Sequence, residues 1–140
     1  MRRERVTEDV YVFISGLYAE VAATVIITPD GAVVIDTLPF PQETQQVRDF
    51  ALRRCQRGIR YVINTHHHAD HIYGSHLFPE AELIAHRRCR QILLKVGEES
   101  LNQAKAQTPA LASVELRIPQ LVFETDLLLR IGDKTLHLMH

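Results

Sequence analysis

The chain passes from an apolar, strand-like segment straight into a histidine cluster, in the sequence Tyr61-Val62-Ile63-Asn64-Thr65-His66-His67-His68-Ala69-Asp70-His71. In an α/β sheet, ligand sites form where strands end at their carboxyl edge. The cluster occupies such a position, and a tight loop there lets imidazole and carboxylate groups point toward a common centre. We therefore predict that this segment carries a ligand site on an α/β sheet.

The residue types in the cluster favour a metal. Imidazole nitrogens and a carboxylate suit zinc, and they also suit iron or manganese. From a tight loop, His66 and His68 would converge on one ion, while Asp70 and His71 reach a second position nearby. A solvent-exposed histidine-rich loop without a ligand is the alternative, but it does not explain why an aspartate and a further histidine follow at this spacing. No cysteine lies in the cluster, which disfavours a structural zinc finger.

Upstream of the cluster, segments rich in β-branched residues predict strands over residues 10–14, 21–28 and 32–35. The last of these is continuously apolar, as expected of a strand covered on both faces, and it ends at Asp36. Apolar positions at helical spacing then predict a helix from Gln42 to Cys55, followed by a stop at Gly58.

Downstream, a short helix through His76 precedes a predicted strand over residues 81–85 and a helix over residues 87–96. Gly97 is expected to end that helix, although weak helical character continues to Gln107. Two further runs, over residues 127–131 and 135–139, predict a β-hairpin. This order of elements indicates the α/β class, with a mixed sheet and helices packed on it.

The composition fits one domain and limits the partners. The chain has 140 residues, 16 basic and 17 acidic, with a formal net charge of −1. Because no field of one sign is available and no apolar run approaches the ~20 residues of a membrane span, we expect neither nucleic acid nor a membrane as partner. Cys55 and Cys89 lie far apart on the apolar sides of helix-like patterns. We expect them to be buried free thiols, which favours a cytoplasmic location.

The cluster resembles the H-x-H-x-D-H signature of the metallo-beta-lactamase superfamily, and the resemblance extends from Tyr11 to His140. Asp36 is similar to the aspartate of that family's I-D-T motif, and Gly74 to the glycine of its D-H-x-x-G pattern. Ile84-Ala85-His86 resembles the strand end that comes next. The family fold is a four-layer αββα sandwich, so the resemblance implies that residues 1–140 form the N-terminal half of one such domain.

The resemblance also implies roles for the site residues. His66 and His68 would bind a first metal, and Asp70 and His71 a second one. Asp70 would in addition be catalytic, because it would orient the hydroxide that the metals hold. Asp36 would not touch a metal but would orient the loop or a ligand through hydrogen bonds.

Other residues near the cluster have more than one interpretation. His67 matches a variable position of the signature and is expected to face solvent. His86 and Tyr73 are possible pocket residues, with a polar strand end and a packing role as the respective alternatives. A basic group at the start of the second long helix is either a solvated face or a contact to an anionic substrate, and it consists of Arg87, Arg88 and Arg90.

By resemblance, the activity is that of a metal-dependent hydrolase that cleaves ester, thioester, lactone or amide bonds of a small molecule with metal-bound hydroxide. Two zinc ions are the implied cofactors of the complete domain. The presence of His71 disfavours the two β-lactamase subclasses that lack this histidine. It favours three groups that keep the histidine: the third β-lactamase subclass, the glyoxalase II-like thioesterases and the lactonases. Flavodiiron proteins carry an acid in place of His68, which disfavours an oxygen-reducing di-iron site. Two alternatives stay open: a mono-iron persulfide dioxygenase and a non-catalytic metal-binding half-domain.

Members of the superfamily complete their site with residues from the second half of the fold, beginning with a histidine in a P-G-H-T-like motif. The segment from Leu136 to His140 resembles the strand just before that motif, so the chain is expected to stop short of this second metal-ligand motif. The predicted helices would cover only one face of the sheet. We therefore expect self-association through the uncovered apolar face.

Overall fold

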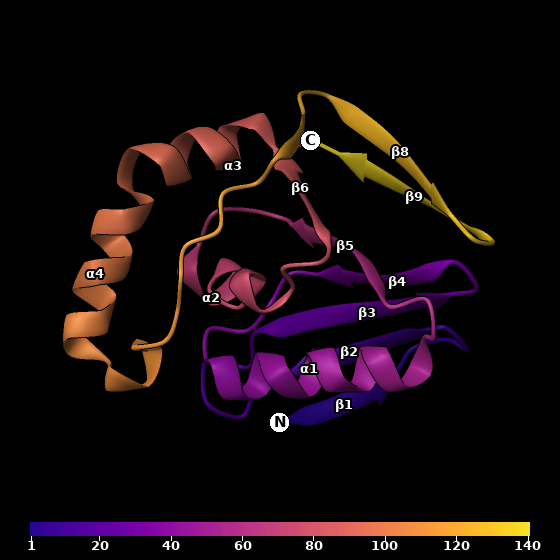
Figure 1. The fold of residues 1–140 in the computed structure, drawn as a ribbon, viewed down its shortest axis with the longest axis horizontal. Coiled ribbons are helices and arrows are strands. Elements are labelled where there is room, and N and C mark those ends of the chain that lie inside the picture. The colour runs from indigo at the N-terminus through magenta and orange to yellow at the C-terminus, as the bar shows by residue number, and fades with distance from the viewer.

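Seven strands form one mixed sheet in the computed structural model, which describes residues 1–140 (Figure 1). Their order across the sheet follows their order in the sequence. The pairs from β1 to β4 are antiparallel, and the pairs from β4 to β7 are parallel. The strands are β1 (Arg2–Arg5), β2 (Val10–Ile14), β3 (Ala22–Thr28), β4 (Gly31–Ile35), β5 (Ile59–Asn64), β6 (Glu82–His86) and β7 (Leu121–Phe123). The predicted fold class is confirmed.

Helix α1 (Pro41–Arg54) covers one face of this sheet (Figure 1). Its side chains Val47 and Phe50 belong to the largest apolar cluster, together with residues of the strands beneath. The Phe50 ring meets Tyr11 and Phe13 edge-on, with ring centroids 4.8 and 5.2 Å apart. Four of the five residues of β4 are buried, which accounts for its unbroken apolar sequence.

The second face of the sheet is partly covered by a hairpin of β8 (Asp126–Ile131) and β9 (Lys134–Met139). Ile131 packs there in one cluster with Val33, Ile63 and Ile84, all of them buried. The expectation of an uncovered face is therefore wrong at its centre, because alternate side chains of the hairpin point onto the sheet: Leu127, Leu129, Leu136 and Leu138. Self-association through the apolar surface that remains, such as the outward-facing Leu128 and Met139, stays a prediction.

Three helical segments follow one another without a break and arc around α2 (Ala69–Ile72) (Figure 1). They are α3 (Arg87–Ile92), a π-helix (Leu93–Gly97) and α4 (Glu98–Gln107). The prediction that Gly97 ends the helix is wrong, because this residue has helical φ and ψ of −62° and −47°. A Cβ atom at Gly97 would lie 2.7 Å from Cδ2 of Leu116. The glycine thus permits close packing of Leu116 against the helix.

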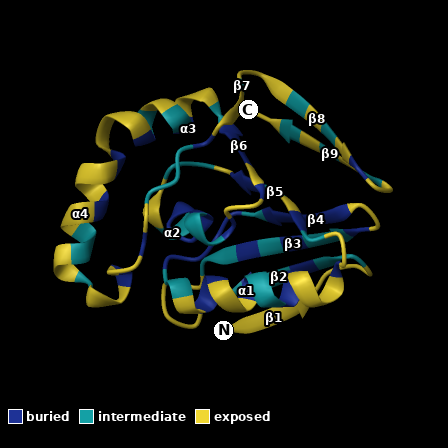
Figure 2. Ribbon diagram, viewed as in Figure 1, coloured by how far each residue is buried: buried dark blue, intermediate teal, exposed yellow.

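The sequence patterns did not predict the two edge strands. All four residues of β1 are exposed, as the yellow colour in Figure 2 shows, so no apolar alternation marks this strand. At the opposite edge, β7 has only three residues. Helix α1 and strands β2, β3, β4, β6, β8 and β9 begin and end within one residue of the predicted bounds. Short 3₁₀ helices over Ser75–Leu77 and Pro109–Leu111 complete the chain.

Both cysteines, Cys55 and Cys89, are free and buried, as predicted. Burial raises the pKa of the Cys89 thiol to about 11, and the charge of Asp36 adds to this effect. The Cys89 thiol is therefore protonated at neutral pH and a poor nucleophile. None of the helices has the length and apolar character needed to cross a bilayer.

Candidate metal centre

The residues of the predicted site meet at one edge of the sheet because β4 and β5 are parallel neighbours. Asp36 follows β4, and His66 lies in the loop after β5. His68 is the N-cap residue of α2, and Asp70 and His71 lie within that helix. The sheet edge and the short helix therefore bring residues 36 and 66–71 to the same place.

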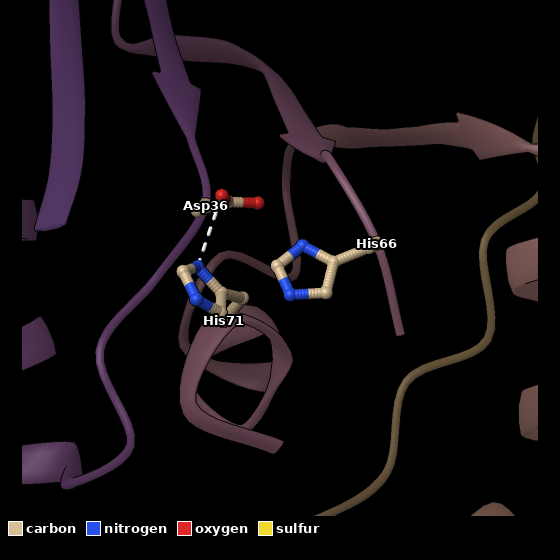
Figure 3. Close-up of side chains that lie close together, drawn as sticks. All are labelled: Asp36, His66 and His71. Atoms are coloured by element: carbon tan, nitrogen blue, oxygen red, sulfur yellow. Dashed lines mark hydrogen bonds and ion pairs between the residues drawn. The ribbon is translucent and has the colours of Figure 1, made fainter. Parts of the chain in front are cut away.

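The tightest group in this cluster consists of Asp36, His66 and His71, each of which offers one ligand atom within 4.8 Å of the others (Figure 3). The centroid of the His66 ring lies 4.3 Å from that of His71 and 4.7 Å from that of His68. Oδ2 of Asp70 lies 3.4 Å from Nε2 of His71. The structure thus brings all five of these residues together.

The Asp36 carboxylate is fully engaged by hydrogen-bond donors of the protein. It accepts hydrogen bonds from the Thr65 amide at 2.7 Å, from the Thr65 hydroxyl at 2.7 Å and from Nδ1 of His71 at 3.1 Å. The backbone of Asp36 has a φ of 57°, a left-handed conformation that aspartate adopts more readily than most residues. Its amide donates to the carbonyl of Ile63 at 2.7 Å. Asp36 therefore acts as an anchor between the two strands.

These contacts define which nitrogen of each histidine carries the proton. The Thr65 hydroxyl donates its only hydrogen to Asp36, so Nδ1 of His66, 2.9 Å away, must donate to the Thr65 oxygen. Nδ1 of His71 donates to Asp36, because a carboxylate only accepts. In the neutral form of each ring, Nε2 therefore keeps a free lone pair. Such an arrangement, with one ring nitrogen bound to the protein, is typical of metal-ligating histidines.

The donor set at this edge fits a cation. When the His71 ring is neutral and protonated at Nδ1, its Nε2 and Oδ2 of Asp70 are two acceptors that face each other at 3.4 Å. A cation held by both atoms relieves their repulsion. Burial lowers the pKa of His66, and the neighbouring His71 lowers it further, which favours the neutral imidazole that a metal requires. His71 and Asp70 could therefore hold one divalent metal, and the neutral imidazole of His66 suits a neighbouring one.

A second group of hydrogen bonds fixes α2 to the sheet. The carbonyl of His71 accepts from the Thr37 amide at 2.9 Å, from the Thr37 hydroxyl at 3.0 Å and from the Asn64 side chain at 3.4 Å. The Thr37 hydroxyl in turn accepts from the amide of Gly74 at 3.0 Å. Thr37, Asn64 and Thr65 were not among the predicted site residues. Isolated polar residues carry no periodic signal, although Thr65 directly precedes the cluster.

We expect the substitution Gly74→Ala to destabilise the fold by about 1–3 kcal/mol, the usual cost of overpacking a core. A Cβ atom at Gly74 would collide with Oγ1 of Thr44 and would lie 2.8 Å from Cβ of Thr37, and both threonines are buried. Urea denaturation measures the change in the free energy of unfolding. Gly58→Asn is the control, because nothing lies within 4 Å of a Cβ there and asparagine tolerates its φ of 75°. Equal stability of the Gly74 variant and the parent would contradict the close packing.

His86 lies at the end of β6, and both of its ring nitrogens are engaged within the chain. Nε2 donates to the carbonyl of Glu124 at 2.7 Å, and Nδ1 accepts from the amide of Arg88 at 3.0 Å. The ring stacks on His140, with centroids 3.8 Å apart. No nitrogen is left for a metal, but the ring lines a cavity beside the cluster.

Tyr73 and His67 lie on the other side of the cluster. Tyr73 is buried among apolar side chains that include Leu93, and burial raises its pKa. His67 was expected to face solvent, but it is half-buried and lines two cavities. The reason is that α3 and the π-helix arc over α2, which a linear pattern does not reveal.

Residues 19–140 match the sequence model of the metallo-beta-lactamase superfamily. The chain belongs to this superfamily. The matched segment contains the entire cluster and Asp36. A comparison with curated proteins found no match.

Solved metallo-beta-lactamase structures share the fold of this superfamily member. FEZ-1 from Legionella gormanii matches with a TM-score of 0.71 and 16% identity, over 96% of this chain and 51% of its own. The subclass B3 enzyme BJP-1 of Bradyrhizobium japonicum matches with a TM-score of 0.69 and 23% identity, over 96% of this chain and 50% of its own. A metallo-beta-lactamase from Pontibacter korlensis matches with a TM-score of 0.70 and 18% identity, over 97% of this chain and 58% of its own. The chain thus spans about half the length of these proteins.

Proposed function

We propose that this chain is the metal-binding part of a zinc-dependent hydrolase that cleaves an ester, thioester, lactone or amide bond of a small molecule. The observation that carries the proposal is the pair of imidazoles whose Nε2 atoms are left free by the hydrogen bonds of Thr65 and Asp36. Membership of the metallo-beta-lactamase superfamily supports it. The names of the solved structures, including a subclass B3 enzyme, favour amide hydrolysis among these reactions.

Within this proposal, His66 and His68 hold one ion, and Asp70 and His71 hold a second. The tightest geometric group includes Asp36 in place of His68 and Asp70, but Asp36 already accepts three hydrogen bonds and is better suited to position the ligands. A divalent metal, when bound, lowers the pKa of a water and polarises a carbonyl group. We propose that residues outside 1–140 complete the ligand set, as the length of the structural neighbours suggests.

Asp70 is the carboxylate available to the reaction. Asp36 already accepts three hydrogen bonds, whereas Asp70 accepts no hydrogen bond from the protein and lies beside Nε2 of His71. An Asp70 oxygen would accept a hydrogen bond from the attacking water and orient it toward the carbonyl carbon. The fixed imidazoles of His66 and His71 would keep the surrounding geometry constant during this step.

The metal and the compartment are finer points of the same proposal. Imidazole and carboxylate ligands fit zinc, and the superfamily as a whole makes zinc our first choice over iron or manganese. The free, buried state of Cys55 and Cys89 suits a reducing compartment such as the cytoplasm.

The test combines metal analysis with an activity panel. The protein, extended by the residues that we propose complete the ligand set, is loaded with zinc or with iron(II), and each form is assayed with an ester, a thioester, a lactone and a β-lactam. Oxygen uptake with a persulfide is measured in parallel. We expect hydrolysis that depends on zinc and is lost after chelation. Oxygen uptake by the iron form, without hydrolysis by the zinc form, would replace the proposal with a persulfide dioxygenase.

A further inference from the structure

An apolar cavity of about 200 Å³ opens beside the predicted metal ligands, between α2 and the π-helix. His67, His68 and Tyr73 line it from α2 and the residues that flank this helix, and Ile92 and Val96 line it from α3 and the π-helix. Six of its ten lining residues are hydrophobic. The cavity therefore offers an apolar environment within reach of a group bound at His68.

The helix that borders this cavity departs from α-helical geometry along the cavity wall. The π-helix Leu93–Gly97 lies between α3 and α4, and three of its five residues line the cavity. Such segments occur often at functional sites, because they reorient side chains of an otherwise regular helix. Val96 points into the cavity yet stays 40% exposed, which leaves apolar surface open to a ligand.

A second cavity of about 220 Å³ lies on the other side of His67, and only two of its eight lining residues are hydrophobic. It contains Thr65, His66 and His86, and it also contains Arg88. Of the three arginines at the start of α3, Arg87 pairs with Glu124 and Arg90 donates to a carbonyl, whereas the guanidinium of Arg88 has no partner. His67 and Ile92 line both cavities and so lie between them.

We propose that the apolar cavity is the subsite for the acyl chain of the substrate, so that the substrate class comprises acyl compounds with an apolar chain. This inference rests on the proposed hydrolase function. A carbonyl held at the metal ligands would place its chain against Val96 and Tyr73, and the polar leaving-group side would face Arg88. Burial of the chain contributes roughly 25 cal/mol per Å² of apolar surface.

The first experiment measures binding without catalysis. The metal-free 140-residue chain is titrated with 2-octanone, which carries a carbonyl and an apolar chain but no bond to hydrolyse, and with acetone as the short analogue. We expect NMR amide shifts confined to residues 67–73 and 92–97, and only with 2-octanone. Val96→Asp should weaken binding by about tenfold or more, as expected when an apolar contact is lost.

Leu94→Asp is the matched control, because Leu94 lies in the same π-helix, is 60% exposed and lines neither cavity. Its affinity for 2-octanone should equal that of the parent. Absence of shifts overturns the proposal. So do shifts confined to the larger cavity between sheet and hairpin, which is lined by Ile26, Ile35 and Leu138.

The second experiment separates this inference from the hydrolase function. The zinc-loaded protein, extended by the residues that we propose complete the ligand set, is assayed with p-nitrophenyl acetate and p-nitrophenyl hexanoate. We expect a higher kcat/KM for hexanoate, and a lower ratio of the two in Val96→Asp than in Leu94→Asp. Hydrolysis without a chain-length preference overturns the subsite alone. Binding of 2-octanone at the cavity without hydrolysis of either ester supports the subsite and counts against the hydrolase function alone.

Discussion

Replacing His66 and His68 together by alanine should abolish binding of one metal ion. Their rings lie 4.7 Å apart between centroids, and His66 is held by Thr65 with Nε2 free. Loss of both imidazoles leaves no nitrogen ligand at that position, so we expect affinity to fall by more than the 10–100-fold typical of losing an outer hydrogen bond. Isothermal titration with zinc measures the stoichiometry and the affinity of the double variant and of the parent.

The matched control removes two other histidines of the same region, His67 and His76. His67 lies between the two predicted ligands in sequence but lines the cavities instead, and Nδ1 of His76 bonds to the carbonyl of Tyr73 at 2.8 Å. Zinc binding of this variant should equal that of the parent. If the His66 and His68 double variant takes up zinc unchanged, the ligand assignment is wrong.

The ligand cluster could be predicted because its residues are contiguous. His66 to His71 follow a strand within one short segment, so spacing alone brings their side chains to one loop. Asp36 lies 29 positions before Thr65, and only resemblance to the superfamily linked it to the loop. The proton positions on His66 and His71 could not be predicted, since they depend on the direction of single hydrogen bonds.

The fold was predictable where burial produces a recognisable pattern of apolar residues in the sequence. The continuous apolar sequence of β4 and the helical spacing of apolar residues in α1 predicted these two elements. Strand β1 consists of four exposed residues and has no such pattern. Gly97 was interpreted as a helix stop because local propensity favours that role. In the structure its function is tertiary, since it admits Leu116. The position of the hairpin on the second face also depends on contacts distant in sequence.

Asp36→Ala should weaken metal affinity by about 10–100-fold, the size of effect seen when a partner of a metal-ligating histidine is lost. The carboxylate fixes the His71 ring and, through the Thr65 hydroxyl, the His66 ring. The same substitution should lower the free energy of unfolding by about 2 kcal/mol or more. It removes hydrogen bonds to a charged group and places alanine at a φ of 57°. With the alanine variant alone, a loss of metal affinity could come either from misplaced histidine rings or from a less stable fold.

Asp36→Asn separates the two effects. Asparagine tolerates the left-handed backbone, its Oδ1 can still accept from the Thr65 amide, and its Nδ2 can donate to the Thr65 hydroxyl oxygen and to Nδ1 of His71. In that last bond Nδ1 of His71 accepts a hydrogen, whereas in the parent it donates one to Asp36. It moves the proton of the neutral His71 ring from Nδ1 to Nε2, the atom that would bind the metal. We expect nearly parental stability in urea, with zinc affinity about 10–100-fold lower in titration.

Nitrogen-15 NMR of the imidazoles reports the proton position directly in the metal-free chain. In the parent, His71 should be protonated at Nδ1, and in Asp36→Asn it should be protonated at Nε2. Because the fold is retained, a loss of affinity in this variant cannot be attributed to unfolding. A parental zinc affinity together with the reversed tautomer would show that Nε2 of His71 does not bind the metal, and Asp36 would then be an anchor of the strand ends only.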